Sequence, residues 1–394
     1  MTLQVMSGNF AQSHAARLAR VQVIAAYPIT PQTTIMEKLA DFVASGELPA
    51  QYVKVESEHS ALQVCVSASA VGARTYTATS SQGLLLMHEL LHWAPSMRAP
   101  IVMGVVNRAV APPWNLGADH TDTMSQRDTG WIQFYAESNQ EVLDTVLQAH
   151  RLAEDPSIRL PVMVTEDAFY LSHTAEPVEV PDAPLVDRFL PARDARATLV
   201  AGVPTRLGSF TGPDHYVRFR REVAYAMARV PEALREIEKD YTSLTGRSHG
   251  GPVPFHRVEG ADAVLVTMGT MSTTARTVVD EMRAEGKRVG LAKLRLFRPF
   301  PIAELRALAH LVDRIGVVDR SYTFGGTGPA ATEVASALYA GPPHPSLSSF
   351  LVGIGGREVT RAHVRAMFDR LIAGEGAETH WMDLPQPAAE VVHG

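Results

Sequence analysis

The chain has 394 residues, and its 36 basic and 42 acidic side chains give a net charge of −6, which argues against a nucleic-acid-binding role. The length exceeds that of one hydrophobic core, so we expect two domains. The single cysteine, Cys65, allows neither a disulfide framework nor a cysteine-bound cluster within the chain. There is no signal-peptide pattern and no run of about eighteen apolar residues, which predicts a soluble, cytoplasmic protein without membrane insertion.

Strand-like and helix-like segments alternate over residues 1–170, which predicts an α/β domain with a doubly wound, mostly parallel sheet. Strands are expected at Val21–Ala26, Tyr52–Glu56, Arg74–Thr79, Pro100–Val106, Trp131–Ala136 and Pro161–Glu166. Helices are expected at Pro31–Ala44, Glu58–Val71, Ser81–Ala94 and Asn139–Ala153.

A smaller α/β domain is expected over residues 256–375, after a linker and arm at 171–255. In the linker, we expect Glu176–Pro191 to be irregular and Arg220–Asp240 to be a charged helix. Strands of the second domain are expected at Ala263–Met268, Arg288–Leu294, Arg314–Asp319 and Ser349–Ile354. Its helices are expected at Thr273–Glu285, Ile302–Leu311, Thr327–Tyr339 and Thr360–Ala373. The tail, residues 376–394, is expected to extend over a partner chain.

The segment Ala26-Tyr-Pro-Ile-Thr-Pro31 joins the first predicted strand to the first predicted helix. Its prolines restrict the backbone, and Pro31 is expected to be the first helical residue, with Thr30 as N-cap. Open α/β sheets bind ligands at such turns, at the carboxyl ends of strands. Thr30 could therefore cap the helix only, or could also help the helix N–H groups to bind an anion.

Two patterns could be taken as metal sites. The sequence His88-Glu-Leu-Leu-His92 fits the H-E-x-x-H motif of zinc peptidases, with Glu89 as the base. The extended motif fails, however, and leucines fill the predicted helix, so a packed or hydrogen-bonded His–Glu pair is favoured. Asp119, His120 and Asp122 are also close in sequence, but such neighbours commonly pair with backbone groups or arginine. We therefore expect no metal ligands in this chain.

Three further segments are loops or turns. The irregular stretch Ala109–Gly130 is expected to form a wall of the active site, because long loops in compact domains tend to be functional. The glycine-rich segments Phe324–Gly328 and Gly353–Arg357 lack the spacing of nucleotide-binding motifs. They are expected to be tight turns between strands and helices.

The turn at residues 26–31 resembles the YPITP signature of the 2-oxoacid:ferredoxin oxidoreductases, in their alpha subunit. Ordered matches continue along nearly the whole chain, at Val55–Ala61, Thr77–Gly83, Val106–Ala109, Asp119–Asp122, Gln126–Trp131 and Lys293–Pro299. The resemblance implies a thiamine diphosphate-binding-type domain followed by a transketolase C-terminal-like domain.

The resemblance also implies a catalytic role for Glu58. In this family a glutamate hydrogen-bonds the aminopyrimidine of thiamine diphosphate and promotes loss of the proton from the thiazolium C2 carbon. Glu58 is therefore expected to be catalytic and to bind the cofactor together with Pro28 and Ile29. From the residues alone, Glu58 could equally be a first-turn acid that complements the helix dipole.

Arg108 and Thr30 are expected, from the same resemblance, to bind the substrate carboxylate. A guanidinium group can hold a carboxylate through two parallel hydrogen bonds. From the residues alone, Arg108 could be a surface arginine at a strand end, and Arg127 is the next candidate for the carboxylate. The oxalate-acting branch of the family has arginine in place of Thr30, so a dicarboxylate substrate is disfavoured.

The implied reaction is the coenzyme A-dependent oxidative decarboxylation of a 2-oxo acid, with pyruvate as the first choice and ferredoxin as electron acceptor. The chain has no Gly-Asp-Gly motif, so a beta subunit is expected to supply the diphosphate and Mg²⁺ site. Iron–sulfur clusters are expected on further cluster-bearing and gamma-type subunits. The segment Pro112-Pro-Trp-Asn-Leu116 departs from pyruvate-specific members, so the alternative is a bulkier acid such as phenylglyoxylate, with an NAD-reducing subunit. A non-catalytic assembly subunit is a remoter alternative.

Overall fold

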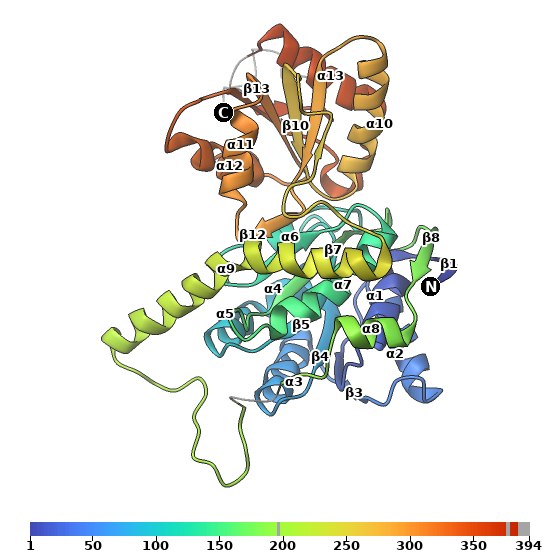
Figure 1. Ribbon diagram of the computed structural model, residues 1–394, viewed down its shortest axis with the longest axis vertical. Helices are drawn as coiled ribbons and strands as arrows, with labels where there is room; N and C mark the ends of the chain where they lie inside the picture. The colour runs from blue at the N-terminus through green and yellow to red at the C-terminus, as the bar shows by residue number, and fades with distance from the viewer. Residues whose placement is uncertain (195–197, 376–378, 385–394) are drawn as a thin grey trace.

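Seven strands form the sheet of the N-terminal unit, in the order β12-β6-β7-β5-β4-β2-β3 (Figure 1). The computed structural model describes residues 1–194, 198–375 and 379–384. All neighbouring strands are parallel except β12, which is antiparallel to β6, so the predicted doubly wound parallel sheet is confirmed. The strands are β2 (Val23–Ala26), β3 (Gln51–Lys54), β4 (Thr75–Thr79), β5 (Ile101–Asn107), β6 (Ile132–Tyr135), β7 (Val162–Asp167) and β12 (Leu296–Arg298).

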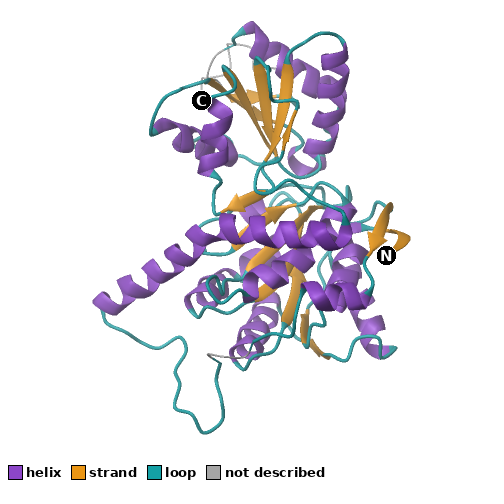
Figure 2. Cartoon of the chain, in the orientation of Figure 1, coloured by secondary structure: helices purple, strands orange, loops and turns teal. Residues whose placement is uncertain are grey.

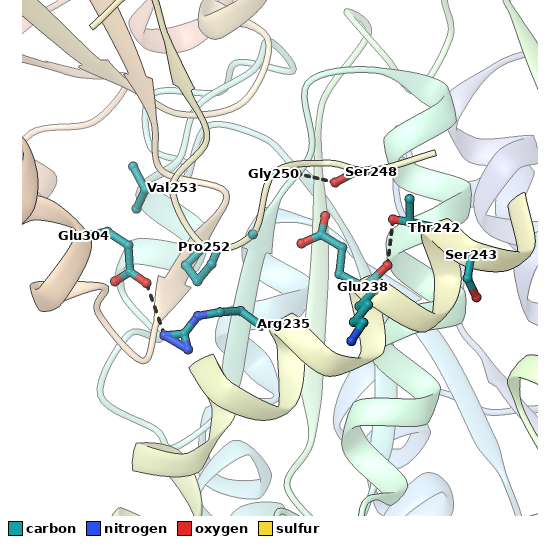
Figure 3. A pocket seen from close by; sticks show the side chains of 11 residues that line it. Arg235, Glu238, Thr242, Ser243, Ser248, Gly250, Pro252, Val253 and Glu304 are labelled. Carbon is teal, nitrogen blue, oxygen red and sulfur yellow. Dashed lines mark hydrogen bonds and ion pairs between the residues drawn. The ribbon is translucent and has the colours of Figure 1, made fainter. Parts of the chain in front are cut away.

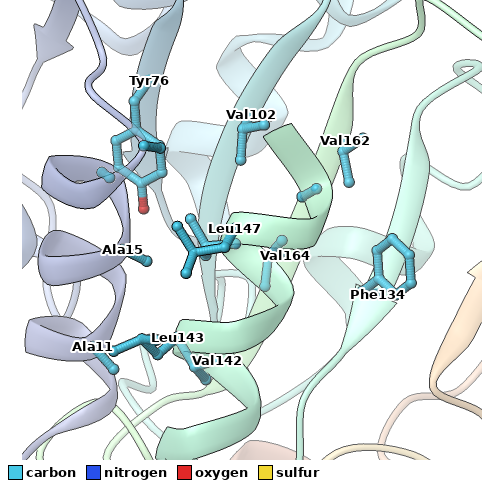
Figure 4. Packing of buried hydrophobic residues seen from close by; sticks show 14 of the residues in the cluster. Ala11, Ala15, Tyr76, Val102, Phe134, Val142, Leu143, Leu147, Val162 and Val164 are labelled. Carbon is cyan, nitrogen blue, oxygen red and sulfur yellow. The ribbon is translucent and has the colours of Figure 1, made fainter. Parts of the chain in front are cut away.

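Helices cover both faces of this sheet (Figure 2). One core joins α1, α2 and α7 to strand residues such as Val102 and Val106, and Figure 4 shows its centre. The other core joins α3, α4 and α5 to the alternate residues Met103 and Val105. Because both faces are covered, β5 is buried along its whole length. The helices are α1 (Gly8–Leu18), α2 (Thr33–Ala44), α3 (Glu58–Ala70), α4 (Ser81–Leu86), α5 (His88–Ser96), α6 (Thr121–Met124) and α7 (Asn139–Glu154).

Two predicted helix boundaries near the strand ends were wrong. The helix expected from Pro31 begins at Thr33, and its N-cap is Gln32, so Thr30 does not cap it. The Gln32 amide donates hydrogen bonds to the carbonyl oxygens of Tyr27 (2.9 Å) and Ala78 (3.0 Å), which holds the residues before the helix as a separate turn. The helix expected over Ser81–Ala94 is divided at Met87 into α4 and α5.

The N-terminal residues and the linker contain elements that were not predicted. β1 (Thr2–Met6) pairs antiparallel with β8 (Glu176–Val180), and α8 (Ala183–Phe189) follows. The expectation that Glu176–Pro191 is irregular was therefore wrong. The strand partner of β8 lies at the other end of the N-terminal unit, so the local sequence pattern does not reveal the pairing.

The helix predicted at Arg220–Asp240 is longer at both ends and forms α9 (Pro213–Thr245). Its C-terminal half packs on the N-terminal unit through residues such as Val230 and Leu234, whereas its N-terminal half projects away from the body (Figure 1). Gly246 closes the helix with φ of +75°, and its N–H group donates to the carbonyl of Thr242. No helix in the described ranges combines the length and apolar character needed to cross a membrane.

Six strands form the sheet of the C-terminal unit, in the order β15-β14-β13-β10-β11-β9, and only β9 is antiparallel to its neighbour. The tail, residues 376–394, was expected to extend over a partner chain. Its residues Thr379–Trp381 instead form β15, which pairs with β14 of the same sheet, so the expectation was wrong for them. Residues 385–394 lie outside the described ranges. The strands are β9 (Phe255–His256), β10 (Ala263–Thr267), β11 (Val289–Lys293), β13 (Arg314–Asp319), β14 (Ser346–Leu351) and β15 (Thr379–Trp381). The helices are α10 (Met271–Ala284), α11 (Ile302–Ala309), α12 (Pro329–Tyr339), η1 (Ile354–Gly356) and α13 (Arg361–Ala373).

Buried ion pairs connect the two units. Lys293 and Arg295, at the end of β11, both contact Glu141 of α7, and Arg295 Nε lies 3.0 Å from its carboxylate. A cavity of about 630 Å³ lies nearby between α9, residues 248–253 and α11, where Arg235 of α9 and Glu304 of α11 form an ion pair at 3.7 Å (Figure 3). None of the predicted site residues lines this cavity.

Candidate active site

Four neighbouring strands end at one edge of the seven-stranded sheet, and the residues that follow them meet there. Thr30 follows β2, Glu58 follows β3 and opens α3, Gln82 follows β4, and Arg108 follows β5. The carboxyl ends of parallel strands lie at a common edge, which is where such sheets bind ligands. The structure therefore brings together Thr30, Glu58 and Arg108, the three residues predicted to act on substrate or cofactor.

Arg108 is the centre of this group. It is only 3% exposed, and its Nη1 donates a hydrogen bond of 2.6 Å to the carbonyl oxygen of Thr30. Its Nη2 donates to Gln82 Oε1, and its Nε is buried without a partner. Burial lowers the pKa of the guanidinium, while Asp122 and Glu58 oppose that shift. Among the described residues, no carboxylate forms an ion pair with it, so Arg108 is a buried cation that could receive an anion.

Glu58 is a buried carboxyl group at the first position of α3, where Ser57 is the N-cap. Burial raises its pKa, whereas its own backbone N–H group and the charge of Arg108 lower it. The carboxylate lies directly over Gly83, since a Cβ atom added there would be 2.5 Å from Glu58 Oε1. Carboxyl groups whose pKa is raised by burial cluster at functional sites.

Side-chain hydrogen bonds from Asn9 and Gln32 hold the turn that contains Thr30. Asn9 of α1 donates hydrogen bonds of 2.7 Å to the carbonyl of Pro31 and to Thr34 Oγ1, in addition to the two bonds from Gln32. On the outer side, Pro28 and Thr30 are exposed and Ile29 is half-buried. The turn therefore presents these three residues on a rigid support.

The carboxylate of Asp122 links several segments of the candidate site. Its carboxylate accepts hydrogen bonds from the backbone N–H groups of Ser81 and Arg108, both at 3.0 Å, from that of Thr123, and from Asn107 Nδ2 at 2.8 Å. Burial raises its pKa to about 6, against the effect of these donors. Asp122 thus joins the start of α4 to the end of β5, and Ser81, with φ of +47°, is held in the left-handed region there.

The residues considered as metal ligands have other partners. His120 Nε2 lies 2.7 Å from Asp167 Oδ1, and Asp119 accepts from the N–H groups of Thr121 (2.8 Å) and Gly355 (3.2 Å). Over the ranges that the structure describes, no three His, Cys, Asp or Glu side chains are grouped as metal ligands would be.

Among the described residues, the side chains of the H-E-x-x-H segment and Arg127 form no hydrogen bond or ion pair with Thr30, Glu58 or Arg108. His88 Nδ1 is 2.6 Å from Gln126 Oε1, the rings of His88 and His92 meet edge to face at 5.0 Å, and Glu89 lies 3.7 Å from His59 rather than beside them. Arg127 contacts the carbonyl of Met124 and lies 3.8–3.9 Å from two carboxylates. It is therefore already neutralised by neighbours.

Sequence reasoning missed two functional contacts, those of Gln82 and Asp122. Gln82 lies within the motif Thr77–Gly83, directly after the buried strand β4, and this position at a strand end could have pointed to it. For Asp122 the sequence favoured pairing with backbone groups over a metal, which is confirmed, but it did not indicate which backbone groups. The bonds of Asp122 to backbone groups from two other segments depend on the tertiary fold and leave no local signal.

The chain resembles known proteins along most of its length. Residues 14–239 match the family model for pyruvate flavodoxin/ferredoxin oxidoreductase, thiamine diphosphate-binding, and residues 261–364 match pyruvate:ferredoxin oxidoreductase core domain II. The chain is 48% identical to the ketoisovalerate oxidoreductase subunit VorA of Pyrococcus horikoshii, over 92% of each chain. It is 43% identical to the pyruvate synthase subunit PorA of Methanocaldococcus jannaschii, over 98% of each.

A solved structure shares the fold. The 2-oxoglutarate:ferredoxin oxidoreductase from Magnetococcus marinus superposes with a TM-score of 0.71 at 19% identity, over 94% of this chain and 65% of that chain. Both predicted domain types, thiamine diphosphate-binding and transketolase C-terminal-like, are confirmed. The chain belongs to the 2-oxoacid:ferredoxin oxidoreductase family, as an alpha subunit of enzymes that use thiamine diphosphate to decarboxylate 2-oxo acids oxidatively.

Proposed function

We propose that Thr30, Glu58 and Arg108 are this subunit's contribution to an active site that oxidatively decarboxylates a short aliphatic 2-oxo acid to its acyl-CoA. The observation that carries the proposal is the buried Arg108 guanidinium, which has no carboxylate partner among the described residues. A buried charge without an ion-pair partner is costly, and the substrate carboxylate would supply that partner. The Arg108 guanidinium group, which already donates to Thr30 and Gln82, would then orient the ketone group of the substrate relative to Glu58.

The residues present fit the thiamine diphosphate that the family uses. Among the described residues Glu58 has no side-chain hydrogen-bond partner, and its raised pKa suits a carboxyl group that shares a proton with an aminopyrimidine nitrogen. Pro28 and Ile29, on the outer side of the same turn, would contact the ring. When bound, the cofactor supplies the nucleophilic carbon and the electron sink for decarboxylation. Glu58 holds the proton, and Arg108 holds the substrate.

The substrate we propose is pyruvate or a slightly larger branched acid. The relatives described above are named for pyruvate and ketoisovalerate, and they match this chain over similar lengths. The tip of the loop after Arg108, Pro112–Leu116, is exposed, while its base is closed by a hydrogen bond of 3.0 Å from Ala109 to Gly117. We propose that this loop faces the substrate side chain, so a panel of 2-oxo acids, including phenylglyoxylate, would identify the substrate.

The remaining parts of the reaction are proposed to lie on partner subunits. The chain lacks a Gly-Asp-Gly motif and has one cysteine, which is buried. A beta subunit would therefore supply the Mg²⁺ and diphosphate site. Cluster-bearing and gamma-type subunits would carry electrons to ferredoxin.

Arg108→Lys tests the carboxylate role in the assembled complex. Lysine keeps the charge but loses the planar fork, so kcat/KM for the 2-oxo acid should fall about 10- to 10²-fold, given about 1.5–3 kcal/mol for a charged hydrogen bond and 1.4 kcal/mol per tenfold. Thermal stability should change little.

The matched control is Arg127→Lys, which changes an arginine that already has carboxylate neighbours. It should leave kcat/KM within about twofold of wild type. If Arg108→Lys lowers the melting temperature but not kcat/KM, Arg108 is structural and the proposal fails.

A further inference from the structure

The N-terminal part of α9 is exposed to solvent along its length. Residues 212–222 are all exposed, and the first fully buried residue of the helix is Ala226. The exposed apolar residues here include Tyr216 (58%), Val217 (64%) and Phe219 (51%), and in the preceding loop Phe210 is fully exposed. In proteins, most helical stability comes from packing of an apolar face, and contiguous exposed apolar surface marks an interaction site.

The start of α9 and the loop before it enclose a groove against α5. The groove has a volume of about 650 Å³, and we call it the arm groove. The loop lies on the ring of Trp93, because a Cβ atom at Gly208 would be 3.2 Å from it. Trp93, Met97, Leu207, Tyr216 and Phe219 line its apolar part, and Arg98, Arg159, Arg206, Arg220 and Glu222 line its charged part.

The charge of the arm groove is strongly positive. Residues 206–229 contain five arginines, two acidic residues and no lysine, in a chain with a net charge of −6. Neither Arg206 nor Arg220 has an ion-pair partner among the described residues. Arg98 and Arg159 both have left-handed backbones, with φ of +54° and +46°, and Arg98 Nε donates to the carbonyl of Arg159 at 3.2 Å. The base of the groove is thus a fixed, basic surface.

We infer that the arm groove receives an acidic segment with aromatic or aliphatic side chains, from a different subunit of the oxidoreductase complex. Arginine, tyrosine, tryptophan and phenylalanine are the residues enriched in interface cores, and lysine is depleted there. The two unpaired arginines would meet carboxylates, and the aromatic wall would cover apolar side chains. The residues of the candidate active site follow the carboxyl ends of their strands. Arg98 and Arg159 instead precede the amino ends of β5 and β7, at the opposite side of the sheet, so the groove is a separate surface. The inference rests on assembly into a complex, and not on the role of Arg108.

Hydrogen exchange in the native complex tests whether the arm is covered. Backbone amides of residues 213–225 should exchange at least about tenfold more slowly in the complex than in the dissociated subunit. If these amides exchange at the same rate in both, the arm is free in the complex and the inference is wrong.

Charge reversal tests the groove itself. Arg206→Glu with Arg220→Glu should weaken subunit association in the complex about tenfold or more, measured by mass photometry on dilution. Arg218→Glu with Arg221→Glu is the control, because this double variant makes the same charge change close by on α9 and neither arginine lines the groove. It should change association by less than about twofold. Equal effects of the two variants would overturn the inference.

A photo-crosslinking probe at Ser209, which lines the groove, identifies the occupant in the native complex. A crosslink to another kind of subunit supports the inference. A crosslink to a second copy of this chain overturns it. Saturable binding of ADP or pyrophosphate to the complex that is lost in the Arg206/Arg220 variant would also overturn it, because the groove would then be a small-anion site.

Discussion

At the scale of single residues, the candidate site depends on two buried groups whose charges are both disfavoured by burial. Burial raises the pKa of Glu58 and lowers that of Arg108, while each charge partly offsets the shift of the other. Neither group forms an ion pair among the described residues, so both remain available to ligands. Shifted pKa values of this kind cluster at functional sites, which supports the roles proposed for these two residues.

Glu58→Gln should keep the fold and slow the proton-transfer step. Glutamine has the same shape but cannot exchange a proton with the aminopyrimidine, so deuterium exchange at the cofactor C2 should slow about 10²–10⁴-fold. The measurement is C2 exchange in the assembled complex. An unchanged rate would remove Glu58 from this role, whereas a changed KM for the 2-oxo acid alone would place it with substrate binding.

At the scale of elements, the start of α4 is built around a close approach. Gly83 has no side chain, and the carboxylate of Glu58 from α3 occupies that space together with Thr79 Oγ1. Asp122 fixes the same helix start by binding the N–H of Ser81. The contacts among the start of α3, the start of α4 and the end of β5 thus fix the positions of Glu58 and Arg108.

Gly83→Ala should displace Glu58. The added Cβ would be 2.5 Å from both Glu58 Oε1 and Thr79 Oγ1, and the flexible end of Glu58 can move at low cost. Activity should therefore fall about tenfold or more, while stability changes by about 1 kcal/mol. Gly341→Ala, at a site with no atom within 4 Å, is the control. In a Glu58→Gln background the effect of Gly83→Ala on activity should largely disappear; full additivity would mean that Gly83 acts elsewhere.

At the scale of the whole molecule, buried charges join the two units. Burial by itself raises the pKa of Glu141. The charges of Lys293, His249 and Arg295 outweigh this effect and lower the pKa to about 2. Since the native pKa lies below the ordinary value of 4.5, this carboxylate stabilises the fold above about pH 4.5, and the contribution is lost as the pH falls towards 2.

Glu141→Gln should lower the free energy of unfolding at pH 7 by about 3–5 kcal/mol, because Lys293 and Arg295 would remain buried without their shared carboxylate. The difference from wild type should shrink as the pH falls below about 4.5, because protonation then removes the same charge in wild type. Urea unfolding at pH 7, 5 and 4 measures both effects. The exposed Glu37→Gln is the control, and a difference that grows on acidification would contradict the assignment.

The sequence by itself determined the α/β fold class and the strands that lead to the site. Alternation of buried strands with amphipathic helices is local, so it can be seen without the tertiary structure. Thr30, Glu58 and Arg108 could be chosen because each follows a strand in a family-like motif, and they do meet at one sheet edge. Their roles stay predictions until the variants above are measured.

Only the tertiary structure decided which groups hold these residues in place. The bonds of Asp122 to Ser81 and Arg108, the pairing of β1 with β8, and the addition of β12 to the first sheet all join segments distant in sequence. The start of α2 at Thr33 was likewise decided by the bond from Gln32 to Ala78 of another strand. Such contacts depend on which segments the packed core brings together. Local helix and strand propensities do not specify which distant segments will meet.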